Sequence, residues 1–227
     1  MAQNNDKQEE KTAIENVNET LTNAGQKLAD NKTVIGWIVG GVFVIAALII
    51  GYMYFFRTPQ VNKAYEAYNQ VEISAAGNDS IAAAQYKKVA DENKGNTAGK
   101  LAALSAGEAL YNQGKYKEAA EYLERFSSSE PVLEANAIVL TGDCYVNLKQ
   151  YDKAISCYEK AIGKADNNSQ IVPRVLLKEA NVYDAQKNYQ KALECYQKIA
   201  KDFPKFQLGN GMTIDAYIER ENARLGK

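Results

Sequence analysis

The chain has 227 residues, of which 46% are hydrophobic, and its basic and acidic side chains nearly balance at a formal net charge of −1. This composition can build a packed core and argues against disorder of the whole chain. The lack of excess positive charge also argues against nucleic acid as a partner.

Histidine is absent, and the only cysteines are Cys144, Cys157 and Cys195. The chain therefore has no imidazole ligand or base, and its thiols are too scattered for a zinc site. We predict that the cysteines are small packing residues, while a Cys144–Cys157 disulfide within one hairpin stays open. No catalytic residue, metal or cofactor is expected, and the chain is predicted not to be an enzyme.

Residues 1–33 form a polar tail with a sparse apolar pattern. The apolar positions, at spacings of three and four, are Ile14, Val17, Leu21, Ala24 and Leu28. Two heptads of this kind are typical of a short coiled coil that forms a homodimer, or of an amphipathic helix that lies on a membrane surface or frays in water. Both interpretations stay open.

The segment Val34–Phe56 contains no charged residue. As a helix it is roughly 34 Å long, which is enough to cross a bilayer core. Trp37 near one end and Tyr52 and Tyr54 near the other match the aromatic belts of membrane interfaces. No small-residue cleavage site follows, so we predict an uncleaved transmembrane anchor, and Pro59 is expected to end its helix.

The orientation of this anchor depends on the lysines and arginines around it. Close to the span the two sides tie, with Arg57 and Lys63 following it, but Lys7 and Lys11 add to the N-terminal side. The positive-inside rule then favours a cytoplasmic N-terminus and places residues 60–227 outside the cytoplasmic membrane. Free cysteines are more common in the cytoplasm, which favours the opposite orientation.

From Val61 onward the hydrophobic period is helical, and three segments align with one another: 103–131, 140–161 and 176–204. Each has a small residue and then a tyrosine that opens a second helix. These tyrosines, Tyr116, Tyr151 and Tyr189, follow each other after 35 and 38 residues, and each precedes an alanine by three positions. The pattern resembles the tetratricopeptide repeat, which implies stacked helical hairpins.

The resemblance predicts an all-α fold, a tetratricopeptide solenoid preceded by one transmembrane helix. Residues 60–212 would form about four hairpins, the first of them a degenerate copy, and residues 213–227 a capping helix. It also implies that proteins or peptides bind a concave groove lined by the first helix of each hairpin. The groove positions given by the alignment are Leu104, Glu108, Tyr111, Val139, Asp143, Val146, Asn147, Leu177, Asn181 and Asp184.

These groove positions are mainly apolar or acidic and lack the basic clamp with which some tetratricopeptide domains bind acidic peptide ends. An acidic peptide end would be repelled, so we expect a moderately hydrophobic or basic segment instead.

The layout of polar tail, single span and small repeat domain resembles the YfgM-like ancillary subunits of the bacterial SecYEG translocon. This implies a periplasmic domain on the inner membrane that acts as a chaperone-like accessory, with SecYEG and periplasmic chaperones as partners. The alternative is a structural scaffold of another envelope or membrane complex that binds no clients.

Overall fold

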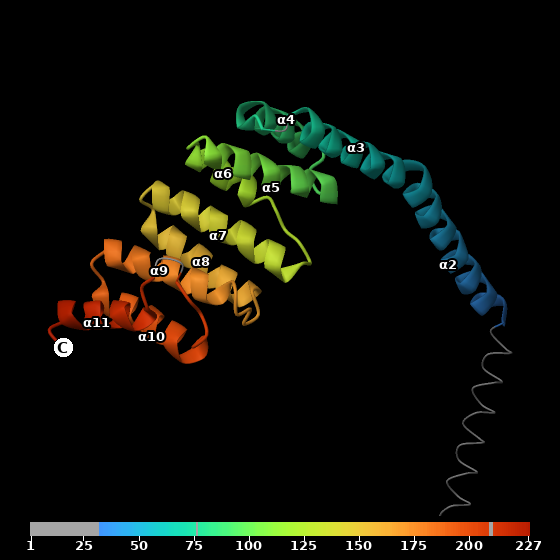
Figure 1. Cartoon of the computed structure of the whole chain (residues 1–227). Coiled ribbons are helices and arrows are strands. Elements are labelled where there is room, and N and C mark those ends of the chain that lie inside the picture. Colours follow the sequence, from blue (N-terminus) through green and yellow to red (C-terminus); the bar gives the residue numbers. More distant parts are fainter. Residues whose placement is uncertain (1–31, 76, 209–210) are drawn as a thin grey trace, which may run out of the picture. The chain divides into compact units, whose positions relative to one another are not determined.

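The computed structural model describes residues 32–75, 77–208 and 211–227, and the regular structure of these residues is helical throughout (Figure 1). The predicted all-α fold is therefore confirmed. The chain divides into two compact units, one up to Gln60 and the other Val61–Lys227. The predicted heptads of residues 14–28 lie outside the described residues.

The first unit contains the apolar segment. Helix α2 (Lys32–Tyr52) is followed by one π-helical segment, η1 (Met53–Arg57), and then by α3 (Thr58–Ser74). No residue of α2 or η1 is buried, and Trp37 is 80% exposed. By its length and composition this helical stretch can cross a membrane.

The prediction that Pro59 ends the helix is wrong, because Pro59 lies in the first turn of α3. The reason is local. In the π-helical turn the backbone N–H of Thr58 donates to the carbonyl of Met53, and the Thr58 hydroxyl donates to the same oxygen at 2.9 Å. The wider turn makes room for the proline ring, and the first turn of a helix tolerates the missing N–H.

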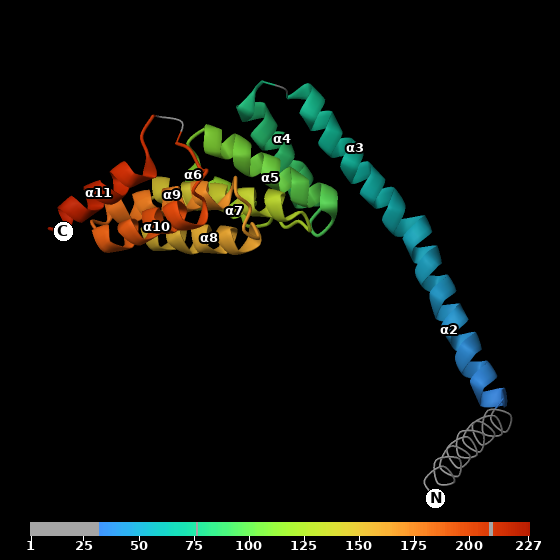
Figure 2. The ribbon, with the colours of Figure 1, turned by 60° about the horizontal axis from the view of Figure 1, so that its bottom comes forward.

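The second unit is a stack of helical hairpins in chain order, which Figures 1 and 2 show from two sides. Three hairpins pair α5 with α6, α7 with α8 and α9 with α10. Helices α3 and α4 precede them, with α4 packed on α5, and α11 follows as a single helix. The bounds are α4 Asp79–Glu92, α5 Thr97–Asn112, α6 Tyr116–Leu123, α7 Pro131–Asn147, α8 Tyr151–Lys164, α9 Val172–Ala185, α10 Tyr189–Asp202 and α11 Ile214–Arg224.

The turns inside three hairpins share one left-handed residue. In each turn one residue has a positive φ: Gly114 at 74°, Lys149 at 57° and Lys187 at 59°. In the first of these turns the N–H of Lys115 donates to the carbonyl of Leu110 at 2.9 Å, which closes the helix end as a Schellman motif does. The same bond recurs in the other two turns, so each hairpin reverses in the same way.

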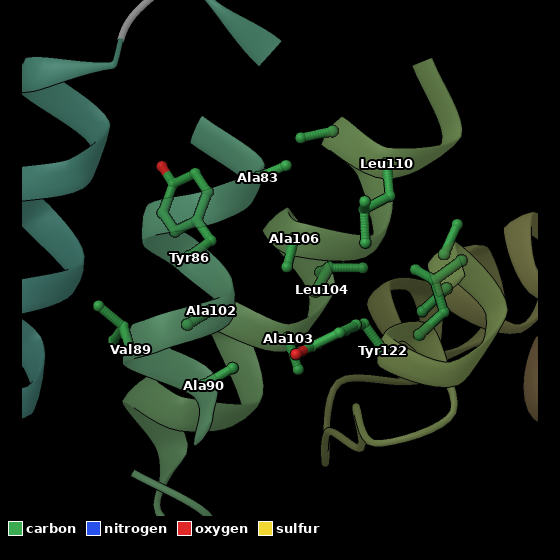
Figure 3. Packing of buried hydrophobic residues seen from close by; sticks show 14 of the residues in the cluster. Ala83, Tyr86, Val89, Ala90, Ala102, Ala103, Leu104, Ala106, Leu110 and Tyr122 are labelled. Carbon is green, nitrogen blue, oxygen red and sulfur yellow. The ribbon is translucent and has the colours of Figure 1, made fainter. Parts of the chain in front are cut away.

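Small residues allow the two helices of a hairpin to pack closely. Ala154 of α8 is completely buried, and a Cβ added to Gly142 would lie 2.6 Å from the ring of Tyr158. At the same place in the preceding hairpin, a Cβ on Gly107 would lie 2.5 Å from Leu123. Leu123 and Tyr158 are thus structurally equivalent. Figure 3 shows the alanine-rich packing of α4, α5 and α6.

Candidate partner-binding groove

The candidate groove is the surface on α5, α7 and α9 that carries the ten positions predicted from the repeats. One of these positions recurs in all three helices, as Glu108, Asp143 and Asn181. The residue that faces this position from the second helix of the hairpin differs. It is Leu123, Tyr158 and Tyr196, respectively.

Asp143 is held by two hairpins at once. The Tyr158 hydroxyl donates to its carboxylate at 2.6 Å, and the Nζ of Lys178 in α9 lies 2.9 Å from both carboxylate oxygens. Only 18% of the Asp143 side chain is exposed, so these bonds to a charged group are only partly screened by water. Burial and this hydrogen bond raise the pKa of Tyr158, which therefore remains a donor. Asp143 ties α7, α8 and α9 together.

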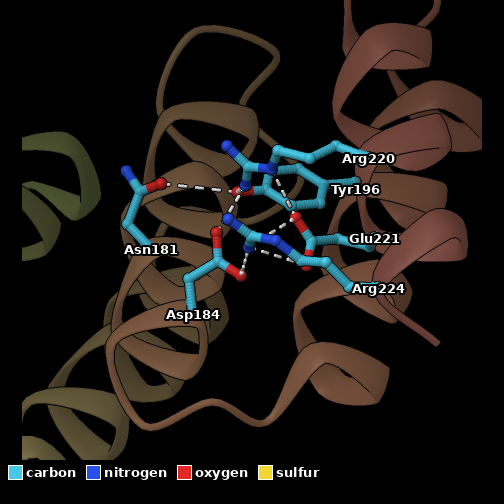
Figure 4. Close-up of polar contacts among 6 residues, drawn as sticks. All are labelled: Asn181, Asp184, Tyr196, Arg220, Glu221 and Arg224. Carbon is cyan, nitrogen blue, oxygen red and sulfur yellow. Dashed lines mark hydrogen bonds and ion pairs between the residues drawn. The ribbon is translucent and has the colours of Figure 1, made fainter.

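The last hairpin is tied to α11 in a similar way (Figure 4). The carboxylate of Asp184 pairs with Arg220 and, at 3.0 Å, with Arg224. The Tyr196 hydroxyl lies 3.4 Å from the amide oxygen of Asn181. Asp184 is therefore engaged within the chain, and α11 covers the C-terminal end of the candidate groove.

Both arginines of α11 also hold a fully buried carboxylate. Glu221, which has no exposed surface, accepts from Arg220 Nε at 2.6 Å and from Arg224 Nη1 at 3.2 Å. A buried charge is tolerated only when it is paired and hydrogen-bonded, and these two contacts supply both conditions. The cluster therefore fixes α11 on α9 and α10.

The apolar positions of the candidate groove differ in accessibility. Leu104 is only 8% exposed and packs within the core cluster of α4, α5 and α6, so its side chain is not available to a partner (Figure 3). Val139, Val146 and Leu177 are half-buried and keep part of their surface open. These three side chains form the accessible apolar part of the groove.

The remaining positions lie at the ends of α5 and α7. Tyr111 is half-buried and its ring meets Tyr116 edge to face at 5.3 Å, while burial raises the pKa of its hydroxyl. Asn147 is exposed and its amide donates to the backbone oxygen of Asp143 at 2.8 Å. Glu108 is exposed and makes no hydrogen bond or ion pair among the residues that the structure describes.

Sequence reasoning did not assign a role to Lys178, Arg220 or Arg224. The signal that could have identified them is an opposite charge about one repeat away from an acidic groove position. Asp143 and Lys178 are 35 residues apart, and Asp184 and Arg220 are 36 apart. Residues one repeat apart occupy neighbouring hairpins, so such pairs meet across the stack.

The described residues contain no group of three His, Cys, Asp or Glu side chains that could hold a metal ion. Cys144, Cys157 and Cys195 are free thiols. Burial raises the pKa of Cys144 and of Cys195 to about 12 in each case, which keeps both protonated and unreactive at neutral pH.

Comparison with known proteins agrees with this geometry. Two crystal structures of MamA have similar folds. One is 23% identical with a TM-score of 0.53, covering 66% of this chain and 80% of the MamA chain. The other is 20% identical with a TM-score of 0.55, covering 73% and 82%. At these identities the likeness concerns the fold. No curated protein sequence matches the chain.

A family model gives the remaining comparison. It matches residues 64–220 and thus more than half of the chain. Repeat families of this type are typically non-enzymatic scaffolds that bind protein partners. The chain belongs to the family described as the Tetratricopeptide repeat protein 21 N-terminal ARM repeat.

Proposed function

We propose that this chain is a membrane-anchored protein-interaction module whose groove holds segments of partner proteins beside the bilayer. The observation that carries the proposal is the exposed apolar surface of α2, which leads through η1 into the first helix of the repeat domain. An apolar surface of this size is unfavourable in water, and its length suits a bilayer core.

The finer proposal is an accessory, chaperone-like role at the SecYEG translocon of an inner membrane. The basic residues before α2 support a cytoplasmic N-terminus and a periplasmic repeat domain. A tether raises the effective concentration of a weak groove near proteins that emerge at the same membrane. SecYEG, its emerging clients and periplasmic chaperones are the proposed partners, and a homodimer through the heptads of residues 14–28 is compatible with this role.

In-cell crosslinking of the full, membrane-embedded chain tests this role. A photo-crosslinking amino acid is placed at Asn147, which is exposed at the end of the candidate groove. Captured proteins are then identified by mass spectrometry. Translocon subunits together with many different secreted chains are the expected result. A single fixed set of other membrane proteins would instead identify a scaffold and overturn the translocon role.

A matched pair of variants tests whether the groove is the binding surface. Val139→Lys with Leu177→Lys adds two charges to the accessible apolar part of the groove. Ser156→Lys with Gln197→Lys adds the same two charges to exposed positions of the second helices α8 and α10. We expect capture to be lost only with the first pair, at equal helicity. Equal capture by both pairs would show that partners dock elsewhere.

The proposed orientation has its own test. In intact spheroplasts, added protease should degrade the repeat domain of residues 61–227, and an epitope tag at the N-terminus should stay protected. Full protection of the repeat domain would show that it is cytoplasmic and would refute the proposed orientation. Periplasmic partners would then be excluded, while binding of cytoplasmic proteins in the groove would still be possible.

A further inference from the structure

The three hairpins differ in how they treat the recurring acidic position of the groove. In α7, Asp143 receives a cation from the next hairpin, Lys178, and a hydroxyl from its own second helix, Tyr158. At the same places of the repeat, the partners of Glu108 would be Leu140 and Leu123. Neither leucine can donate a hydrogen bond or carry a charge. Glu108 is a carboxylate at a position where the fold elsewhere supplies a cation, but here none is supplied.

A pocket of about 380 Å³ opens beside Glu108 between α3, α4 and α5. Its charged lining residues are all acidic, namely Glu72, Asp79 and Glu108, and none of its described lining residues is Lys or Arg. The pocket lies within the second unit and continues the candidate groove toward the N-terminal end of the stack, because Glu108 belongs to both.

Two tyrosines, one from α3 and one from α4, are among the residues that line this pocket, and they contact each other. Tyr68 and Tyr86 have ring centroids 5.4 Å apart, and the Tyr68 hydroxyl lies 3.2 Å from Ser105 Oγ. Aromatic rings accept the alkyl stem of lysine or the guanidinium plane of arginine, and their faces attract cations. Two tyrosines together with three acidic lining residues are complementary to a long basic side chain and repel an anion.

The surroundings of Glu108 also have an electrostatic cost that a ligand could relieve. The Glu108 side chain reaches solvent, but the protein atoms around it partly desolvate its carboxyl and raise the pKa, with no positive charge nearby to lower it. Burial is the main cause that raises the pKa of Tyr86, followed by the neighbouring Tyr68 and by the charges of Glu72 and Glu108. A cation placed in the pocket would therefore favour the ionised form of Glu108.

We infer that this pocket holds a lysine or arginine side chain of a partner protein, with Glu108 as its counter-ion and Tyr68 and Tyr86 against its stem. The inference rests on the proposed function, because it assigns the chemistry of one subsite of the groove. It requires a basic residue in the segment that the groove binds, so a segment without one binds more weakly.

The test uses the full chain in lipid nanodiscs and labelled, capped peptides followed by fluorescence anisotropy. The first peptide has the central sequence Leu-Ala-Lys-Ala-Leu, and its matched partner has norleucine in place of lysine. We expect the lysine peptide to bind at least roughly fivefold more tightly than the norleucine peptide, and Glu108→Gln to abolish that difference. Glu121→Gln, which removes the same charge from an exposed position of α6, should leave it unchanged.

A charge swap gives the positive control. A third peptide has glutamate in place of the central lysine. The Glu108→Lys variant should bind the lysine peptide more weakly than the parent does and the glutamate peptide more tightly. Equal affinities for lysine and norleucine, no binding of either, or an equal effect of Glu121→Gln would each overturn the inference. So would a Glu108-dependent dimer in sedimentation velocity without peptide, because a second copy would then fill the pocket. If Glu108→Gln leaves in-cell capture intact, the proposed function stands and only this subsite is wrong.

Discussion

The hydroxyl of Tyr158 donates a 2.6 Å hydrogen bond to Asp143, and the same carboxylate pairs with Lys178. One acidic side chain therefore joins the two helices of its own hairpin to the first helix of the next. In a stack where each hairpin contacts only its neighbours, such a junction transmits stability from one repeat to another.

Removing the hydroxyl tests this junction. Tyr158→Phe keeps the ring against Gly142 but deletes a hydrogen bond to a charged group, so it should lower the free energy of unfolding by about 1–2 kcal/mol. Asp143→Ala should cost more, because it leaves both the Tyr158 hydroxyl and Lys178 without their acceptor. Urea unfolding of the full chain in detergent, followed by circular dichroism, measures both. A neutral Tyr158→Phe would mean that the bond contributes nothing net.

The close approach at Gly142 predicts a second result. Gly142→Ala places a Cβ 2.6 Å from the Tyr158 ring, which must shift, and we expect a loss of about 1–3 kcal/mol. Gly163→Ala is the matched control, since its Cβ meets no atom within 4 Å on the exposed side of α8. There alanine should stabilise the helix by up to about 1 kcal/mol. The same sign for both variants would contradict the assigned packing.

The left-handed turn residues allow a stabilising change. Lys149 has a φ of 57°, where a side chain is strained and glycine is not. Lys149→Gly should therefore raise the free energy of unfolding by about 1 kcal/mol, and the melting temperature with it. Lys160→Gly, in the interior of α8, should instead cost about 1 kcal/mol. Differential scanning calorimetry on both variants separates the turn effect from the general effect of losing a lysine.

Glu179 makes the stability of the domain depend on pH. Burial, together with the charge of Glu159, raises its pKa from an ordinary 4.5 to about 7. The folded state therefore binds a proton that the unfolded state releases between these values, so stability should fall as pH rises from 4.5 to 7 and then level off.

Glu179→Gln removes this dependence while it keeps a polar group beside Tyr183. At pH 8 the variant should be more stable than the parent by up to about 3 kcal/mol, and near pH 4.5 the two should be alike. Thermal melts across this pH range measure the difference. A parent and a variant that respond identically to pH would show that Glu179 titrates normally.

Much of the fold could be predicted from the sequence because residues of fixed size recur at fixed positions of the repeat. Glycine or alanine where helices touch and tyrosine at each second helix define the hairpins, and these positions hardly depend on anything outside one hairpin. The prediction for Pro59 was wrong because the helix accommodates this proline only after a π-helical turn, and no sequence pattern predicts such a turn.

The candidate groove was less predictable from sequence. Helical periodicity predicts which face of a helix is turned toward a neighbour, but the packing of one helix on the next decides which side chains meet. In this chain Leu104 is buried, and Arg220 of α11 pairs with Asp184. Charges at the spacing of one repeat would have anticipated the ion pairs, whereas the burial of Leu104 depends on how α4, α5 and α6 pack together.

The helix α11 has one more consequence. By neutralising Asp184 with its own arginines it ends the groove at the C-terminal side, whereas Glu108 at the opposite side keeps its charge unmatched. The two ends of the groove therefore differ in charge, which gives the groove a direction. A segment with a basic residue at one end can lie along it favourably in only one direction, so the domain would select the orientation of its partner as well as its composition.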